Sequence, residues 1–434
     1  MTDFPLAPRA LPLVGHSLAL LRHPLPFLES LPSHGDVVGI RLGPATMAMV
    51  CSPDLLHTMF MDDRTFDKGG LVYDRAARVI GHTSIAIATR DDHRRLRRAA
   101  QPGFAPERMA DYARQATREV DTATSRWRDG QDVDIHQEMM GLTSRVLVSA
   151  LITGLSDEQG RLLADDLSTV TVRRWARAML LPPALLRLPT PGNRDYWQAR
   201  NRLRQMSASL VAARRSSPVD TGDLLSALLA PGTGGPSDQE VLDSVTTYFV
   251  AAVETGAAGL SWALYLLSQH AEVAEALHAE AASVLGGRAA TADDVHLLPL
   301  AVRVATEVLR LYPPVWFITR TVTATTTLGG YTLKEGTTVG FSPYMIQRRP
   351  DLYPDPGRFD PDREPGPRNA LIPFGSGARK CMGDNLAMIE LVVTLATIAG
   401  RWRLTYTDGP RPLTPTFGLT LAPRPFTLRV TLHS

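Results

Sequence analysis

The sequence predicts a mainly α-helical protein with small β-sheets. Helical patterns of apolar residues dominate the 434-residue chain from about residue 91 to 312. Alternating, β-branched segments bounded by glycine turns lie on both sides of that region. A chain of this length with 44% hydrophobic residues has enough apolar material to bury a large core.

Charge and cysteine content narrow the class of protein. The net charge of +2 shows no imbalance that would point to nucleic acid or an acidic membrane as a partner. Cys51 and Cys381 are the two cysteines, too few for a disulfide framework, which fits a reducing cytosol. Prolines interrupt the N-terminal region, and no unbroken apolar run of about 18 residues appears. We therefore expect a cytoplasmic protein without a membrane anchor.

The first strands and the longest helix have clear sequence signals. Residues 36–52 alternate around a Gly43-Pro44 turn, which predicts two short strands. Proline- and glycine-rich loops at 181–193 and 229–238 divide the helical region. Ser237 followed by Glu240 has the spacing of a capping box, and no proline occurs from there to His270. This predicts a helix of about 34 residues, roughly 50 Å long, which is apolar on most sides and therefore buried.

The remaining elements follow in order. Residues 271–285 predict a helix ended by Gly286-Gly287, and residues 298–312 predict another, ended by Pro313-Pro314. The segment 319–342 predicts strands and hairpins, and 343–373 is too rich in proline for either regular structure. Strands return between 402 and 433.

Cys381 lies in the stretch PFGSGARKCMGDNLAMIE, residues 373–390. Most free cysteines are small buried hydrophobes, and that is the ordinary interpretation here. The loop does not fit a phosphate-binding pattern, because no register contains a Walker motif and Lys380 occupies the third glycine position of a dinucleotide motif. Arg379, Lys380 and the start of a following helix instead favour a thiolate. Glycines in the loop permit the close approach of a flat ligand.

This stretch resembles the haem-binding signature of the bacterial cytochrome P450 superfamily. Every fixed position matches, and Ala387 and Glu390 extend the similarity; the matching residues are Phe374, Gly375, Gly377, Arg379, Cys381 and Gly383. The resemblance implies one domain over residues 1–434 with the P450 fold, a triangular prism. Its β-rich portion would cover about 36–70 and 316–342, and its helical portion about 91–312 and 381–400. Haem b would lie between the long central helix and the cysteine-bearing helix, with Cys381 as the iron ligand.

Two further groups of residues match the family in the expected order. Glu307-x-x-Arg310 and Arg358 of the PGRF segment resemble its structural ion network, although Glu-x-x-Arg alone also occurs on solvated helix faces. The resemblance assigns His93, Arg97, Arg320 and Arg379 to the haem propionates, with Phe374 packed beside the sulfur and Gly375 in the cofactor loop. An exposed basic helix face is the alternative for the cluster at 93–98, and it is the one we favour for Arg94, Arg95 and Arg98.

The long helix carries Glu254-Thr255, which resembles the family's acid–threonine pair. In the family this pair kinks the helix and relays protons during oxygen activation. The alternative is that Thr255 bonds a carbonyl four residues back. Ala252 stands where glycine is common and would narrow the oxygen groove. Gly256 stands where threonine or serine is frequent and would loosen the helix.

The resemblance implies a haem-thiolate monooxygenase that inserts one oxygen atom from O2 into an apolar small molecule. Electrons would come from a separate ferredoxin and ferredoxin reductase, which Arg94, Arg95 and Arg98 would help to dock, and the protein would be a monomer. A peroxide-driven haem enzyme and a non-catalytic gas sensor or carrier are the alternatives. Retention of Glu254-Thr255 argues against the first, and no appended signalling segment supports the second.

Substrate contacts are expected from an aromatic, charge-poor wall, which suits a terpenoid of secondary metabolism. Its candidate residues are Val72, Ile85, Phe249, Ala252, Trp316 and Phe317. The N-terminal segment and the FDKGG motif at 66–70 also resemble terpene-oxidising bacterial members. A polyketide or macrolide is the alternative substrate, and ordinary core packing is the alternative role for these side chains.

Overall fold

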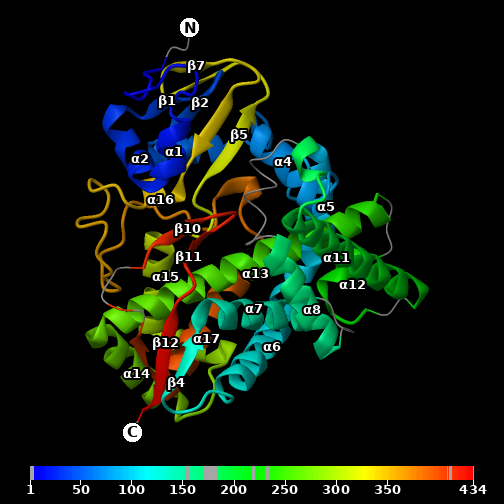
Figure 1. The fold of residues 1–434 in the computed structure, drawn as a ribbon, viewed down its shortest axis with the longest axis vertical. Coiled ribbons are helices and arrows are strands. Elements are labelled where there is room, and N and C mark those ends of the chain that lie inside the picture. The colour runs from blue at the N-terminus through cyan, green and yellow to red at the C-terminus, as the bar shows by residue number, and fades with distance from the viewer. Residues whose placement is uncertain are drawn as a thin grey trace. The chain divides into compact units, whose positions relative to one another are not determined.

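The computed structural model describes residues 4–151, 156–170, 183–217, 220–230, 234–407, 409 and 413–433 (Figure 1). The chain forms two compact units. The first comprises residues 1–75 and 309–381, and the second comprises residues 76–308 and 382–434. Helices α4 (Leu71–Ile80) and α15 (Pro299–Leu311) carry the chain from one unit to the other.

The first unit is built on a five-stranded mixed sheet in the order β1-β2-β8-β5-β3. Antiparallel β1 and β2 pair from Val37↔Val50 to Leu42↔Ala45 around Gly43, which has a φ of +62°. The parallel pair β2–β8 joins strands far apart in sequence. The elements of this unit are α1 (Ser17–Arg22), α2 (Pro24–Ser30), a 3-10 turn (Leu31–His34), β1 (Val37–Leu42), β2 (Ala45–Val50), α3 (Pro53–Met61), β3 (Phe66–Asp67), β5 (Ile318–Val322), β6 (Thr326–Leu328), β7 (Tyr331–Leu333), β8 (Thr338–Phe341), α16 (Pro343–Ile346) and a 3-10 turn (Gly377–Arg379).

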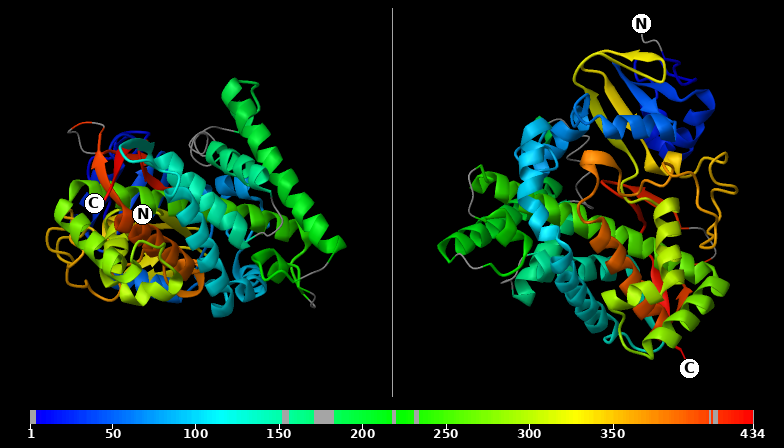
Figure 2. Two further views of the ribbon diagram at one scale, coloured as in Figure 1. Left: turned by 90° about the horizontal axis from the view of Figure 1, so that it is seen from below. Right: turned by 180° about the vertical axis from the view of Figure 1, so that it is seen from behind.

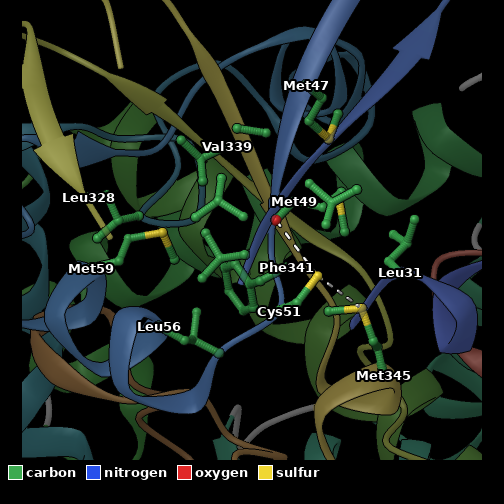
Figure 3. Packing of buried hydrophobic residues seen from close by; sticks show 14 of the residues in the cluster. Leu31, Met47, Met49, Cys51, Leu56, Met59, Leu328, Val339, Phe341 and Met345 are labelled. Carbon is green, nitrogen blue, oxygen red and sulfur yellow. Dashed lines mark hydrogen bonds between the residues drawn. The ribbon is translucent and has the colours of Figure 1, made fainter. Parts of the chain in front are cut away.

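The core of the first unit forms where this sheet meets α2, α3 and α16. Cys51 is completely buried in it, among Met49, Phe341 and Met345 (Figure 3). Its thiol donates to the Met49 carbonyl at 3.7 Å and lies 3.9 Å from the Met345 sulfur. Cys51 therefore behaves as a small hydrophobe.

The second unit is mostly helical, and its small sheet pairs β12 with β4 and β9. Its central helix α13 packs against α7, α11 and α17 (Figure 1; Figure 2 shows the fold from two more directions). The elements are α5 (Arg90–Ala100), a 3-10 turn (Gln101–Phe104), α6 (Pro106–Thr124), β4 (Gln131–Asp134), α7 (Ile135–Leu151), α8 (Asp157–Ser168), α10 (Pro183–Leu186), α11 (Pro191–Ser216), α12 (Leu224–Leu228), α13 (Asp238–Gln269), α14 (Ala271–Leu285), a 3-10 turn (Ala292–Leu297), α17 (Asp384–Arg401), β9 (Trp402–Tyr406), β10 (Pro415–Phe417), β11 (Leu421–Pro423) and β12 (Thr427–Leu432).

The capping box predicted at the start of helix α13 is present. The Ser237 side chain accepts from the Glu240 backbone N–H, and Glu240 reaches back to the Ser237 N–H at 2.8 Å. The helix runs for 32 residues. Within the described residues it is the one helix long and apolar enough to cross a membrane, but 78% of its apolar window is buried, as expected of a core helix.

Most predicted elements are present, with local differences. Helix α14 ends at Gly286, whose φ of +56° confirms the predicted glycine stop. Helix α3 interrupts the predicted β-rich segment 36–70, because Pro53 starts a helical turn directly after β2. Strand β4 interrupts the predicted helical region 91–312, and the loop predicted at 181–193 contains the short helix α10. Residues 181–182 and 231–233 of the two predicted loops lie outside the described residues.

Candidate active site

The Cys381 loop bends through left-handed backbone conformations that glycine adopts readily. Gly375 and Gly377 both have a φ of +68°, in the left-handed region. A Cβ on Gly377 would lie 2.2 Å from the Phe60 carbonyl oxygen, whereas a Cβ on Gly375 would meet nothing within 4 Å. The Cys381 N–H donates to the Phe374 carbonyl at 2.9 Å, which closes the loop. Cys381 is exposed, in contrast to the buried Cys51.

The helix predicted to start at the cysteine starts later. Helix α17 begins at Asp384, so Cys381 lies three residues before it, on the loop. Phe374 is half-buried in the same loop. The sulfur therefore owes its exposure to the loop rather than to a helical position.

Two of the arginines that are predicted to bind the haem propionates, Arg320 and Arg379, lie close together in the first unit. The Arg379 guanidinium donates from Nη2 to the Asp67 carboxylate, and its Nε lies 3.9 Å from Asp63. Arg320 on β5 donates to the Tyr73 hydroxyl at 2.8 Å. Burial lowers the pKa of Arg379, the nearby Asp67 carboxylate opposes that change, and the positive charge of Arg320 adds to it. The two guanidinium groups are thus close enough to repel each other, which is the arrangement that an anionic group stabilises.

The other two predicted propionate residues share helix α5. His93 is buried and Arg97, one turn later, is half-buried. Their neighbours on the helix form ion pairs: Arg94 with Asp91 at 3.0 Å, and Arg95 with both Asp92 and Glu240. Arg95 therefore ties α5 to the first turn of α13, which gives it a structural role beyond a basic surface.

Arg310 of the predicted ion network is 2% exposed and stabilises the proline-rich segment 343–373 by donating to its backbone carbonyls. It donates to the carbonyls of Gln347 at 2.8 Å, Pro356 at 2.9 Å and Arg358 at 3.4 Å. Glu307, one turn before it on α15, is also buried. Arg358 is exposed, and its bond to Arg310 uses its carbonyl rather than its guanidinium.

Thr255 is half-buried in helix α13 and follows the exposed residues Ala251 and Ala252. Its hydroxyl donates to the Ala251 carbonyl at 2.6 Å, the bond that the sequence offered as an alternative role. Ala251 and Ala252 are exposed, although the residues around them are buried. Helix α13 runs from Asp238 to Gln269 without interruption at this point.

Glu254 is buried, and its carboxylate is held by a residue that the sequence did not indicate. Thr420, in the turn between β10 and β11, donates to Glu254 Oε1 at 2.8 Å. Both side chains are almost fully buried, at 3% and 1% exposed. No sequence signal links two positions 166 residues apart; the fold brings them together.

Gly256 allows α7 to approach α13 closely. A Cβ at Gly256 would lie 3.1 Å from the Thr143 methyl group, and the Thr143 hydroxyl donates to the Val253 carbonyl at 3.1 Å. Gly256 therefore lies at a close contact between the two helices. The same Cβ would be 3.9 Å from Oε2 of Glu390, whose pKa burial raises to about 8.

The predicted substrate residues occupy different environments. Phe249 on α13 and Ile85 are buried, and Asp243 on α13 fixes the turn before Ile85 by accepting from the Thr83 N–H at 3.1 Å and hydroxyl at 2.8 Å. In the first unit, Trp316 and Phe317 are half-buried with ring centroids 6.0 Å apart. Val72 lies on α4, and its side chain is outside the described set.

A cavity of about 250 Å³ lies elsewhere in the second unit, at the C-terminal end of α13. None of the predicted site residues lines it. Its lining residues are Leu267, Ser268, Ala271, Ala274, Glu275, Ile398, Ala399, Trp402, Arg403, Leu404, Thr405 and His433.

The residues present fit a haem. The first unit supplies an accessible thiol on a glycine loop and two clustered guanidinium groups, which match the soft-ligand and carboxylate-binding needs of an iron porphyrin. Within the described residues, no group of three or more His, Cys, Asp or Glu side chains could hold a metal ion.

Comparison with known proteins identifies the family. The cytochrome P450 family model matches residues 5–430. The chain is 42% identical to cyclooctat-9-en-7-ol 5-monooxygenase of Streptomyces melanosporofaciens over 409 residues, covering 92% of this chain and 89% of the relative. It is 39% identical to pentalenene oxygenase of Streptomyces avermitilis over 409 residues, covering 92% and 91%.

Among solved structures, the fold is similar to the haem domain of cytochrome P450DA. The TM-score is 0.86, with 24% sequence identity and coverage of 99% of this chain and 98% of the other. This likeness confirms the predicted fold class. The chain therefore belongs to the cytochrome P450 family and is a haem-thiolate monooxygenase.

Proposed function

We propose that this monooxygenase oxidises a cyclic terpenoid of secondary metabolism. The observation that carries the proposal is the similarity over more than nine-tenths of the chain to two Streptomyces enzymes named for a cyclic terpene and a cyclic terpene alcohol. The apolar candidates Ile85, Phe249, Ala252, Trp316 and Phe317 agree with a substrate that offers few hydrogen-bonding groups. Val72 completes this set of candidate substrate contacts.

The proposed cofactor is haem b. Cys381 would ligate the iron through its thiolate, while Arg320, Arg379, Arg97 and His93 would bind the propionates. Bound haem supplies the iron that activates O2, so that one oxygen atom enters the substrate and the other leaves as water after two electrons and two protons are added. Phe374 would limit access of water to the sulfur.

The chain's own contribution to the chemistry is proton supply. We assign the proton-holding hydroxyl to Thr255 and the proton source to the Glu254 carboxyl. The Thr420 hydroxyl positions that carboxyl through its bond to Oε1, and the bond of Thr255 to the Ala251 carbonyl holds its hydroxyl on the exposed part of α13. Electrons would come from a separate ferredoxin and its reductase.

Spectroscopy with candidate substrates tests the substrate class. The purified haem-loaded protein is titrated with cyclic terpenes and terpene alcohols, and with a macrolide as the competing class. Terpenes should displace water from the iron and shift the spin state with saturation, and product analysis with O2 and redox partners should show addition of one oxygen atom. A spin-state response and turnover confined to the macrolide would contradict the proposal.

A matched pair of threonine variants tests the proton role. Thr247 lies two turns before Thr255 on α13 and makes the same bond, to the Asp243 carbonyl at 2.8 Å. Thr255→Ala should sharply lower the fraction of consumed O2 that appears in product, because a general acid–base group contributes typically about 10²–10⁴-fold. Thr247→Ala should leave that fraction unchanged. Equal coupling in both variants would exclude the proton role for Thr255.

A further inference from the structure

One edge of the first unit's sheet places two acids against the clustered arginines. Asp67 on β3 lies opposite Thr321 on β5, next to Arg320 in that strand. Asp67 Oδ1 accepts from Arg379 Nη2 and also from the Lys68 backbone N–H at 2.8 Å, so its carboxylate is fixed in place. The Asp63 carboxylate lies 3.9 Å from Arg379 Nε.

The pair between Asp67 and Arg379 is shielded from solvent. Each side chain is 3% exposed, and the Asp63 side chain is 13% exposed. Charges this deeply buried are screened little by salt, so they interact strongly with each other and with any third charge that approaches. Arg320 and Arg379 supply two positive charges, and Asp63 and Asp67 supply two negative charges, so the cluster is already balanced without a ligand.

We propose that Asp67, assisted by the more distant Asp63, is a built-in counter-ion of Arg379 that weakens the hold of this cluster on a haem propionate. The inference rests on the proposed role of Arg379 and Arg320 in binding propionates. Asp67 and a propionate carboxylate compete for the same guanidinium, so each reduces the charge that the other experiences. Asp67 is thus a positioning residue that orients Arg379 and moderates its charge.

The test is the rate at which haem leaves the protein. Ferric haem-loaded protein is mixed with excess apomyoglobin, and haem transfer is followed by absorbance, which requires no turnover. Asp67→Asn keeps the size and Oδ1 acceptor but removes the charge, and it should slow haem loss by about fivefold or more, the scale of a modest coupling between two bound groups. Asp63→Asn should slow it less, because that acid is farther away and more exposed.

Two controls isolate the charge at this cluster. Asp67→Glu keeps the charge and should leave haem loss close to wild type. Asp351→Asn removes an acid from another arginine pair of the same unit, with Arg349, and should have no effect. Thermal melting adds an independent readout: Asp67→Asn should lower the melting temperature of the haem-free protein more than that of the haem-loaded protein, because the propionate replaces the lost counter-ion.

The possible results distinguish a failure of the counter-ion role of Asp67 from a failure of the propionate assignment of Arg379 and Arg320. Unchanged or faster haem loss in Asp67→Asn, with faster loss in Arg379→Gln, would overturn the counter-ion role while leaving the propionate role of Arg379 intact. Unchanged loss in both Arg379→Gln and Arg320→Gln would overturn the propionate assignment and this inference together. If Asp67→Asn does not fold, Asp63→Asn decides: slower loss supports the proposal, and unchanged or faster loss overturns it.

Discussion

The two cysteines show how far the surroundings of one side chain decide its chemistry. Cys51 is completely buried among methionines and phenylalanine, and desolvation raises its pKa to about 12 although Arg349 opposes the change (Figure 3). Cys381 is exposed on a loop whose backbone bends through two glycines with positive φ. The first thiol fills space, and the second is available to a ligand. A cysteine count alone does not separate these roles.

Replacing each cysteine by serine should give the largest difference between the two cysteines. Cys381→Ser should abolish the far-shifted Soret band of the reduced, carbon monoxide-bound protein, because the thiolate ligand is lost. Cys51→Ser should keep that band and lose about 1–3 kcal/mol of unfolding free energy, since a hydroxyl replaces a thiol in an apolar core. Difference spectra and denaturant titrations measure both. A retained band in Cys381→Ser would refute the ligand assignment.

The rates at which the two thiols are chemically labelled should give the next largest difference between Cys381 and Cys51. With a pKa of about 12, only about 1 in 10,000 Cys51 side chains is a thiolate at pH 8, and the thiolate is the reactive form. In haem-free protein, iodoacetamide should therefore modify Cys381 at least about 100-fold faster than Cys51, as followed by peptide mass spectrometry. Labelling of Cys51 should rise with pH up to about 12. Similar rates at pH 8 would show that Cys51 is not protected as the fold requires.

The two loop glycines offer a matched test of the Cys381 backbone. Both have a φ of +68°, so alanine at either position should cost about 1–2 kcal/mol for the left-handed conformation. Gly377→Ala should cost about 1–3 kcal/mol more, because its Cβ would lie 2.2 Å from the Phe60 carbonyl oxygen. Urea unfolding of Gly375→Ala and Gly377→Ala measures the difference. Equal losses would mean that the contact with Phe60 does not constrain the loop.

Burial raises the pKa of a carboxyl group as well as that of the Cys51 thiol: the group is Glu390, near Gly256. Burial raises its pKa from 4.5 to about 8, so the folded protein binds this proton more tightly than the unfolded chain does. Its contribution to stability is therefore fully present below about pH 4.5 and is lost as the pH rises to about 8. Glu390→Gln should flatten the fall in melting temperature across that window.

The exposed Glu275, which pairs with Arg403 at 2.7 Å, is the control for this measurement. Glu275→Gln should leave the pH dependence of the melting temperature unchanged, because an exposed pair contributes little. If Glu390→Gln retains the wild-type slope, another group is responsible for the pH dependence.

The sequence predicts the site from motifs whose residues are neighbours in the chain. The loop around Cys381 and the Glu254-Thr255 pair are contiguous motifs. Contacts across the chain were not predictable: Thr420 meets Glu254 through a turn of the C-terminal strands, and Asp67 meets Arg379 across 312 residues. The contact at Gly256 was not predictable either, because only the packing of Thr143 against α13 shows that the glycine lies at a close helix contact.

The sequence by itself determined most of the helices and strands, the capping box of α13, the glycine stop of α14 and the position of a cysteine on the glycine loop. These features follow from local hydrogen bonding, backbone freedom and periodicity, which act over a few residues. The tertiary structure alone decided which carboxylates are buried, which hydroxyls hold them and which acids pair with which arginines. Burial and long-range pairing set those properties, because desolvation and charge interaction depend on distance in space rather than along the chain.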